Sequence, residues 1–340
     1  MSEDFKSYIA ALVSGAPLAR DEARAAFSLI FSGDATSAQL GAFLMGLRLR
    51  GETIDEIIGA AEAMRAAMTP VEAPADAIDI VGTGGDGAGT YNISTLAAII
   101  AAAAGAIVAK HGGKAATSLS GSSDVLGELG VRVGVSPAAA AASLREAGIC
   151  FMAATTHHPA MRHAAPVRSE LGVRTIFNLL GPLCNPARVE RQMIGVFSRD
   201  WLEPLAHALR ELGAKRVWLL HGDDGLDEAT TTGVTHVVAL EDGEIRSFDF
   251  SPEEAGLPRA TIQALVGGDA AHNARALRAV LEGAQNAYRD VAVLNAGVAL
   301  VVAGRAANLR EGAALAEAAI DSGAARDKLD ALIRCSHRDA

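Results

Sequence analysis

The chain has 340 residues, a formal net charge of −10 and hydrophobic residues at half of its positions. This length and apolar content allow a large buried core, exclude a disordered chain and favour two domains, and the acidic balance disfavours a general nucleic-acid binder. The three cysteines lack metal-ligand spacing, and the N-terminus is unlike a signal peptide. The longest apolar run, 93–109, is too interrupted to span a membrane. These features predict a cytoplasmic protein.

Residues 1–69 are predicted to form an all-helical domain. Apolar side chains recur there at positions i, i+3, i+4 and i+7, as at Leu40, Phe43, Leu44 and Leu47. Thr53 and Glu56 have the capping-box spacing ahead of another apolar face. Pro70 is expected to end the last helix, and a Pro/Ala/acidic linker over 70–77 follows.

From residue 78 onward, short apolar strands alternate with helical stretches, which is typical of a mostly parallel sheet wrapped by helices. Asp242-Gly243 has the composition of a hairpin turn, and the chain is alanine-rich and helical from about residue 270. The expected strands are 78–81, 106–110, 149–153, 192–197, 217–221 and 235–240. We therefore expect a larger α/β domain over 78–340.

A glycine-rich loop, Gly82 to Thr90, follows the first of these strands and precedes a helix. Its backbone N–H groups and the polar Asn92, Ser94 and Thr95 at the start of the helix suit a phosphate or pyrophosphate. The loop also fits G-x-G-x-x-G, but the next strand leads into Lys110-His111 instead of the acidic residue that a dinucleotide site expects. A purely structural glycine turn remains the alternative.

A second anion-binding segment is predicted after the next strand. Lys110 and Lys114 supply charge there, and a helix is expected to start near Asp124. Hydroxyl groups precede that helix at Ser118, Ser120, Ser122 and Ser123. The alternative is a solvated loop with a Ser/Asp cap.

Three histidines, His157, His158 and His163, lie close together in the sequence, but their spacing disfavours a metal site on one helix turn. Arg168 follows in a segment poor in charge and suits a planar carboxylate, although a helix-surface arginine is the alternative.

Four acidic residues fall within six positions after the strand 217–221. They are Asp223, Asp224, Asp227 and Glu228. Such carboxylates bind Mg²⁺ when phosphate oxygens and waters complete the octahedron, and we expect Asp227 and Glu228 to face solvent. A solvated acidic turn is the alternative.

Together these segments resemble the anthranilate phosphoribosyltransferase family of the tryptophan pathway. The matching motifs are Gly82-Thr-Gly-Gly-Asp86 with Asn92-Ile-Ser-Thr95, Lys110-His-Gly, Ser120-Gly-Ser-Ser-Asp-Val-Leu126, His158-Pro-Ala-Met161, Pro166-Val-Arg168, Leu171 to Leu183 with Asn185-Pro186, and His221-Gly with Asp224-Gly-Leu-Asp-Glu228. The resemblance covers nearly the whole chain. It implies the nucleoside phosphorylase/phosphoribosyltransferase class of fold, in which part of 170–190 returns to a small helical domain that carries a homodimer interface.

The resemblance also implies the substrates phosphoribosyl pyrophosphate and anthranilate, with Mg²⁺ as cofactor, and no nucleic-acid or membrane partner. It assigns phosphoribosyl pyrophosphate to Gly82, Gly84, Gly85, Asp86, Thr90, Asn92, Ser94, Thr95, Lys110 and Ser122. It assigns anthranilate to Gly82, His111, His158, Arg168 and Pro182. It assigns Mg²⁺ to Ser94, Asp227 and Glu228. His111 and His158 are candidates for a general base.

The sequence departs from the family after Lys110-His-Gly, where Gly113-Lys114 stands in place of Asn-Arg. Glycine cannot replace the amide of the family asparagine that contacts the acceptor, and lysine lacks the planar fork of arginine. Two other functions stay open: a pyrimidine nucleoside phosphorylase-like enzyme, and a non-catalytic relative that binds nucleic acid.

Overall fold

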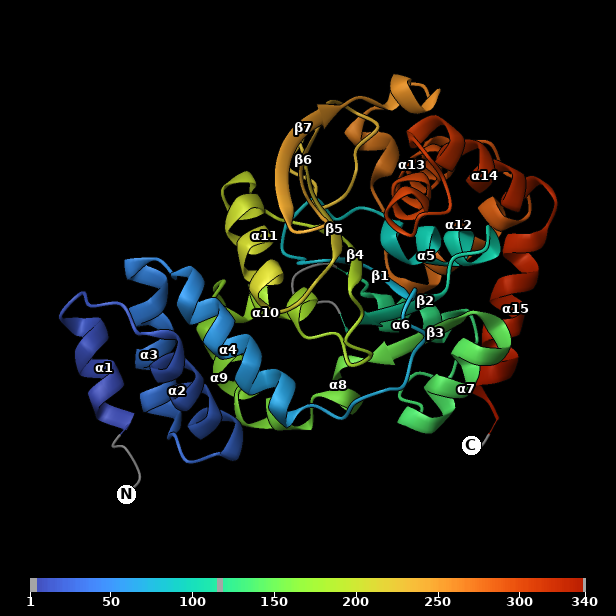
Figure 1. The fold of residues 1–340 in the computed structure, drawn as a ribbon. Helices are drawn as coiled ribbons and strands as arrows, with labels where there is room; N and C mark the ends of the chain where they lie inside the picture. Colours follow the sequence, from blue (N-terminus) through green and yellow to red (C-terminus); the bar gives the residue numbers. More distant parts are fainter. Residues whose placement is uncertain (1–4, 115–118, 339–340) are drawn as a thin grey trace.

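The computed structural model describes residues 5–114 and 119–338 and shows a small helical part beside a larger α/β part (Figure 1). The N-terminal helices are α1 (Phe5–Val13), α2 (Arg20–Ser32), α3 (Ser37–Arg50) and α4 (Ile54–Ala67). The predicted apolar face of α3 is fully buried, and the Thr53–Glu56 capping box is present at the start of α4. The helix α4 ends at Ala67, three residues before Pro70.

A seven-stranded sheet forms the centre of the larger part, in the order β3-β2-β1-β4-β5-β6-β7. The strands are β1 (Ile78–Gly82), β2 (Val108–Gly112), β3 (Ile149–Ala153), β4 (Arg191–Gly195), β5 (Arg216–Gly222), β6 (Thr235–Glu241) and β7 (Glu244–Phe250). Pairing is parallel from β3 to β5 and antiparallel at β5-β6 and β6-β7. The predicted hairpin is confirmed, with positive φ at Asp242 (52°) and Gly243 (86°).

The second strand was misplaced by the sequence pattern. Pairing with β3 runs from Val108 to Gly112, so the strand begins and ends two residues later than the expected 106–110 and contains His111 as well as Lys110. The Ala106 N–H donates to the carbonyl of Ala101, so Ala106 belongs to the turn that follows the preceding helix. The ladder of backbone hydrogen bonds decides this boundary, and the apolar run alone does not.

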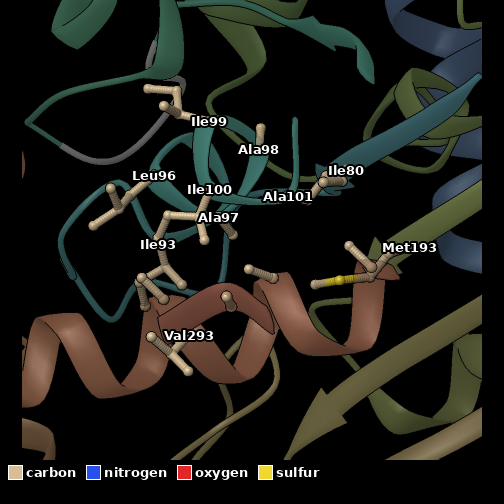
Figure 2. Packing of buried hydrophobic residues seen from close by; sticks show 14 of the residues in the cluster. Ile80, Ile93, Leu96, Ala97, Ala98, Ile99, Ile100, Ala101, Met193 and Val293 are labelled. Atoms are coloured by element: carbon tan, nitrogen blue, oxygen red, sulfur yellow. The ribbon is translucent and has the colours of Figure 1, made fainter. Parts of the chain in front are cut away.

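Helices cover both faces of the sheet. The helices of the α/β part are α5 (Ile93–Ala103), α6 (Ser122–Glu128), α7 (Pro137–Ala147), α11 (Leu202–Glu211), α12 (Ala270–Leu281), α13 (Ala287–Val302), α14 (Leu309–Asp321) and α15 (Ala324–Ser336), with 3₁₀ turns η2 (Arg199–Trp201), η3 (Pro252–Ala255) and η4 (Ile262–Leu265). On one face α5 packs against α13, and Figure 2 shows the helix that carries Val293 beside the helix that carries Ile93 and Ala97. Ile80 and Met193 extend this cluster onto the sheet.

The chain returns to the N-terminal helices between β3 and β4. This segment contains α8 (Ala154–His157), η1 (Pro159–His163), α9 (Ala165–Leu171) and α10 (Phe177–Leu183). Phe177 packs edge-on against Phe27 of α2, and both belong to the apolar cluster that fills the helical part. Arg65 of α4 donates to the carbonyls of Leu183 and Leu212, which ties the helical part to α10 and α11. Over the described residues no helix combines the length and apolar character needed to cross a bilayer.

Candidate functional site

A cavity of about 390 Å³ opens at the carboxyl ends of β1 and β2. In the sheet, β2 lies on one side of β1 and β4 lies on the other, so the strand order reverses direction at β1. Ligands of parallel α/β sheets bind at the carboxyl ends of the strands where the order reverses. Three segments line the cavity: the glycine loop into α5, the end of β2 with the start of α6, and the acidic pair after β5. The site residues predicted from the sequence that line the cavity are Gly82, Gly84, Gly85, Asp86, Thr90, Asn92, Ser94, Thr95, Lys110, His111, Ser122, Asp227 and Glu228. Gly113 and Lys114 also line it, whereas Ser118 lies outside the described residues.

The glycine loop adopts a backbone that other residues rarely adopt. Gly84 and Gly85 have φ of +67° and +80°. The Gly84 N–H donates to Asp227 Oδ2 at 2.6 Å, and the carbonyl of Gly85 accepts from Arg174 at 2.8 Å. One loop N–H, that of Gly84, therefore already donates to an acidic group, as the N–H groups of a phosphate site do.

Asp227 and Glu228 are buried, with 8% and 7% of their surfaces exposed, so the expectation that they face solvent is wrong. The reason is the close approach of the acidic loop to the sheet. A Cβ at Gly195 would lie 1.5 Å from the carbonyl oxygen of Asp227, and one at Gly82 would lie 2.5 Å from its carboxylate. These neighbouring strand-end glycines, paired in the ladder, let the loop lie directly on β1 and β4.

Burial changes the acid–base properties of this pair. It raises the pKa of Glu228 to about 7, opposed by Lys110, and it raises the pKa of Asp227, with further contributions from Glu228 and Asp86. The Ser94 N–H donates to Glu228 Oε1 at 3.2 Å, while Oε2 is buried without a hydrogen-bond partner in the described chain. A divalent cation would satisfy the free oxygen and favour the ionised forms. The donor set therefore fits Mg²⁺, which prefers carboxylate and phosphate oxygens.

Lys110 and Asp79 form the buried floor of the site. The ammonium group of Lys110 donates to the carbonyl of Ile80, and burial lowers its pKa while nearby carboxylates oppose this. Asp79 accepts from the His111 N–H at 3.0 Å and from Asn185 at 2.7 Å. Burial raises the pKa of Asp79 to about 6, opposed first by Lys110. This carboxylate thus holds β2 in place below the cavity.

Asn92 is held at the other end of the glycine loop. Its Oδ1 accepts from Asn273 of α12 at 2.9 Å, and its Nδ2 donates to the carbonyl of Ser120 at 3.1 Å. The hydroxyl of Tyr288 donates to the Asn92 carbonyl at 3.2 Å. The first turn of α5 is therefore coupled to the start of α6 and to the C-terminal helices.

His111 and His158 lie side by side, with ring centroids 4.9 Å apart. Burial lowers the pKa of His111 to about 3, with a further contribution from His158, and it lowers the pKa of His158 to about 4, with a further contribution from His157. Both rings are thus neutral at pH 7 and are weak bases. The His111 Nε2 and both ring nitrogens of His158 are buried without hydrogen-bond partners among the described residues. Pro182 lies buried on α10 and accepts from Gln192 through its carbonyl at 2.8 Å.

Arg168 is not brought to the cavity. Its guanidinium lies over the Phe177 ring, 5.0 Å from the centroid, and the described lining of the cavity does not contain it. Burial lowers its pKa, and within the described chain its side chain has no carboxylate partner. Among the described residues, no group of three or more His, Cys, Asp or Glu side chains is placed to hold a metal ion.

Four polar residues with roles at the site did not stand out in the sequence. Asp79 is the single charge in the apolar strand β1, and Asn295 interrupts the apolar run of α13, so both carried a usable signal. Arg174 lies within the matching segment Leu171 to Leu183 but had no assigned role, and Asn273 carried no signal; their contacts join segments 89 and 181 residues apart.

Comparisons with known proteins agree with this geometry. Residues 74–326 match the glycosyl transferase family, a/b domain, and residues 6–68 match the helical bundle domain of the same family. The chain is 63% identical to an anthranilate phosphoribosyltransferase of Methylocella silvestris, covering 98% of this chain and 95% of that one.

Solved structures are also similar over nearly full length. The anthranilate phosphoribosyltransferase of Thermus thermophilus has a TM-score of 0.92 and 42% identity, with 97% of this chain and 99% of that chain covered. The Saccharomyces cerevisiae enzyme in complex with PRPP (phosphoribosyl pyrophosphate) and Mg has a TM-score of 0.90 and 30% identity, with 98% and 97% covered.

Proposed function

The chain belongs to the anthranilate phosphoribosyltransferase family, and we propose that it transfers the phosphoribosyl group of phosphoribosyl pyrophosphate to the amine of anthranilate. The products are N-(5-phosphoribosyl)anthranilate and pyrophosphate, as a step of tryptophan biosynthesis. One observation carries the assignment to this cavity. A positive-φ glycine loop and a buried acidic pair with an unpartnered oxygen meet in one space, which suits a polyphosphate together with a cation.

We propose that the phosphoribosyl pyrophosphate lies along the glycine loop and the start of α5. Gly84 and its neighbours line the cavity, and the N-terminus of α5 favours negative charge. The binding set is Gly82, Gly84, Gly85, Asp86, Thr90, Asn92, Ser94, Thr95, Lys110 and Ser122. The ammonium group of Lys110, which donates to the Ile80 carbonyl at the floor of the cavity, would bind a ligand oxygen in place of that carbonyl.

Mg²⁺ belongs to this proposal, held by Asp227, Glu228 and Ser94. When bound, it would neutralise charge on the pyrophosphate as that group leaves the sugar. The relative from Saccharomyces cerevisiae, solved with PRPP and Mg, supports this choice.

The acceptor half of the proposal places anthranilate at Gly82, His111, His158 and Pro182, with Arg168 facing its carboxylate. The neutral histidine rings and the buried proline offer a weakly polar wall for an aromatic ring. Since Arg168 lies on α9 and over Phe177, it reaches the acceptor only if α9 approaches the sheet.

The residues of this chain act mainly by holding the reactants. Bond breaking at the ribose C1 develops positive charge on the sugar and negative charge on the pyrophosphate, which the loop amides and Lys110 stabilise. The amine of anthranilate is a weak nucleophile, so its orientation beside C1 matters more than activation. The low pKa values of His111 and His158 make both weak general bases, and we assign them to orientation of the acceptor.

We also propose a homodimer through the helical part and a cytoplasmic location. A groove between α1 and α3 is lined by apolar residues, and Val13 and Leu49 on it are each 82% exposed. Exposed apolar side chains at one groove mark a contact surface. The free thiols Cys150 and Cys184 are typical of a reducing compartment.

The direct test is to incubate the protein with phosphoribosyl pyrophosphate, Mg²⁺ and anthranilate and to follow the loss of anthranilate fluorescence. Loss that requires all three components is expected. Turnover of a pyrimidine nucleoside with inorganic phosphate would instead support the phosphorylase, and a shifted nucleic-acid band without turnover would support the non-catalytic relative.

A further inference from the structure

Asn295 is a buried amide in the middle of an apolar helix. It has 0% exposure, and the sequence around it, Val291 to Val302, is otherwise made of aliphatic residues, alanine and glycine. A buried amide is costly unless its donors and acceptor are paired. Its partners therefore indicate why this position of α13 is polar.

The side chain of Asn295 pairs with one backbone unit outside its helix. Its Oδ1 accepts from the Ala229 N–H at 2.9 Å, and its Nδ2 donates to the Ala229 carbonyl at 2.8 Å. The second Nδ2 hydrogen goes to the carbonyl of Val291 at 2.8 Å. Both amide functions are used, so only one orientation of the side chain satisfies Ala229.

Ala229 directly follows the acidic pair Asp227–Glu228, in an irregular loop between β5 and β6. The loop has no ladder partner at this point, and Ala229 is itself fully buried. Asn295 thus supplies the two hydrogen bonds that a neighbouring strand would supply. The Thr230 N–H bonds to the hydroxyl of Thr235, so the chain is held immediately beyond this point as well.

The same helix fixes the other side of the acidic pair. Packing of α13 against α5, visible in Figure 2, sets the position of the first turn of α5, where the Ser94 N–H meets Glu228. Asn295 of α13 therefore holds the residue after Glu228, and Ser94 of α5 holds Glu228 itself. The acidic pair is fixed in this way by two helices that pack against each other.

We propose that Asn295 is a positioning residue that holds Asp227 and Glu228 in the geometry that binds the divalent cation. This inference rests on the proposed metal site and adds a residue that does not itself touch the cation. Partners of this kind typically change metal affinity about ten- to a hundredfold when removed.

The test compares Asn295→Ala with the wild-type protein in two measurements. The first is Mn²⁺ binding followed by electron paramagnetic resonance, with equal phosphoribosyl pyrophosphate in every sample. The second is the Mg²⁺ concentration that gives half-maximal turnover. Asn295→Ala is expected to weaken Mn²⁺ binding on the order of tenfold and to regain turnover at high Mg²⁺. Asn295→Asp, which keeps the side-chain volume but loses both donors, should behave in the same direction and serves if the alanine variant does not fold.

Asn308→Ala is the matched control, because Asn308 caps α14 through the Glu311 N–H and is exposed. It should lower the melting temperature without changing Mn²⁺ binding. Wild-type Mn²⁺ affinity in a folded Asn295 variant, or an equal loss in Asn308→Ala, would overturn the inference and leave the metal site standing. Failure of the wild-type protein to bind Mn²⁺ would overturn both.

Discussion

At the scale of single residues, the site is governed by burial of charge. Asp79, Lys110, Asp227 and Glu228 are all at most 8% exposed, and each has a pKa shifted by that burial. Such groups remain ionised only where partners or a cation stabilise the charge. Substitutions there are therefore expected to change ligand binding before they change the fold.

Asp227→Asn combined with Glu228→Gln should remove most turnover while leaving the protein folded. Neutral amides of similar size remove two buried like charges, so the melting temperature should stay close to that of wild type. Glu253→Gln with Glu254→Gln, which changes the net charge equally at exposed positions, is the control. Full activity of the first double variant would disprove the metal assignment.

The raised pKa of Glu228 predicts the pH dependence of cation binding. A carboxyl with a pKa of about 7 is largely protonated at pH 6 and largely ionised at pH 8, and a cation binds the ionised form. Mn²⁺ affinity should therefore rise from pH 6 to pH 8. A flat profile would show that the pair is ionised throughout this range.

Arg168→Ala should raise the KM for anthranilate and leave the affinity for phosphoribosyl pyrophosphate unchanged. A lost charged hydrogen bond costs about 1.5–3 kcal/mol, which is roughly ten- to more than a hundredfold. Aniline, which lacks the carboxylate, should not distinguish the variant from wild type. Arg162→Ala is a control at a nearby arginine on η1, and an unchanged KM in Arg168→Ala would leave Arg168 a structural residue on Phe177.

Gly113→Asn should lower the KM for anthranilate with little effect on phosphoribosyl pyrophosphate. Gly113 is not in the left-handed region, and a Cβ there would lie 3.7 Å from the Cβ of Ala154, an ordinary contact. The substitution is therefore expected to fold, as thermal melting would verify. Gly113→Ala adds the Cβ without the amide. If Gly113→Asn uses anthranilate no better than that control, a neighbour has taken over the contact or another aromatic amine is the acceptor.

At the scale of elements, the glycine loop depends on neighbours from distant parts of the chain. Its first half accepts from Arg174 and donates to Asp227, and its last residues pair with the segment around Val266. The loop is thus tethered at both ends while its middle faces the cavity.

Gly85→Val should weaken phosphoribosyl pyrophosphate binding far more than acceptor binding. A β-branched residue at a φ of +80° is strained and would shift the loop amides. Gly283→Val is matched for strain, since Gly283 has a φ of +102° and open space around it, away from the cavity. Calorimetry is expected to show loss of affinity only in the first variant, and equal affinities would contradict the role of the loop.

At the scale of the whole molecule, two large apolar clusters hold most of the buried apolar residues that the structure describes. One joins α5, α13 and one face of the sheet, and the other joins the N-terminal helices, α10, α11 and the opposite face. The cavity lies where the sheet ends, and the segment around α9 and α10 connects it to the helical part. Movement of the helical part would therefore carry Arg168 relative to the cavity.

Val13→Asp with Leu49→Asp should convert a dimer into a monomer. Both side chains are 82% exposed on the groove of the helical part, and charge there would oppose its burial against a second copy. Light scattering after size exclusion measures the mass, and Leu315→Asp on α14 is the control at a 36% exposed apolar position. An unchanged mass in the double variant would place any dimer contact elsewhere.

Several features followed from the sequence because they depend on neighbours a few residues apart. The capping box at Thr53, the buried face of α3 and the Asp242-Gly243 hairpin are of this kind. The order of motifs also sufficed to indicate the family and its fold. Local hydrogen bonds and periodic burial determine these features, whatever lies further along the chain.

Tertiary packing decided the rest. The burial of Asp227 depends on Gly82 and Gly195, the support of Glu228 on Asn295, and the position of Arg168 on Phe177. Each of these depends on how the helices and strands pack. Side-chain charge was readable from the sequence, but the low dielectric that shifts each pKa and the partners that offset it exist only in the packed protein.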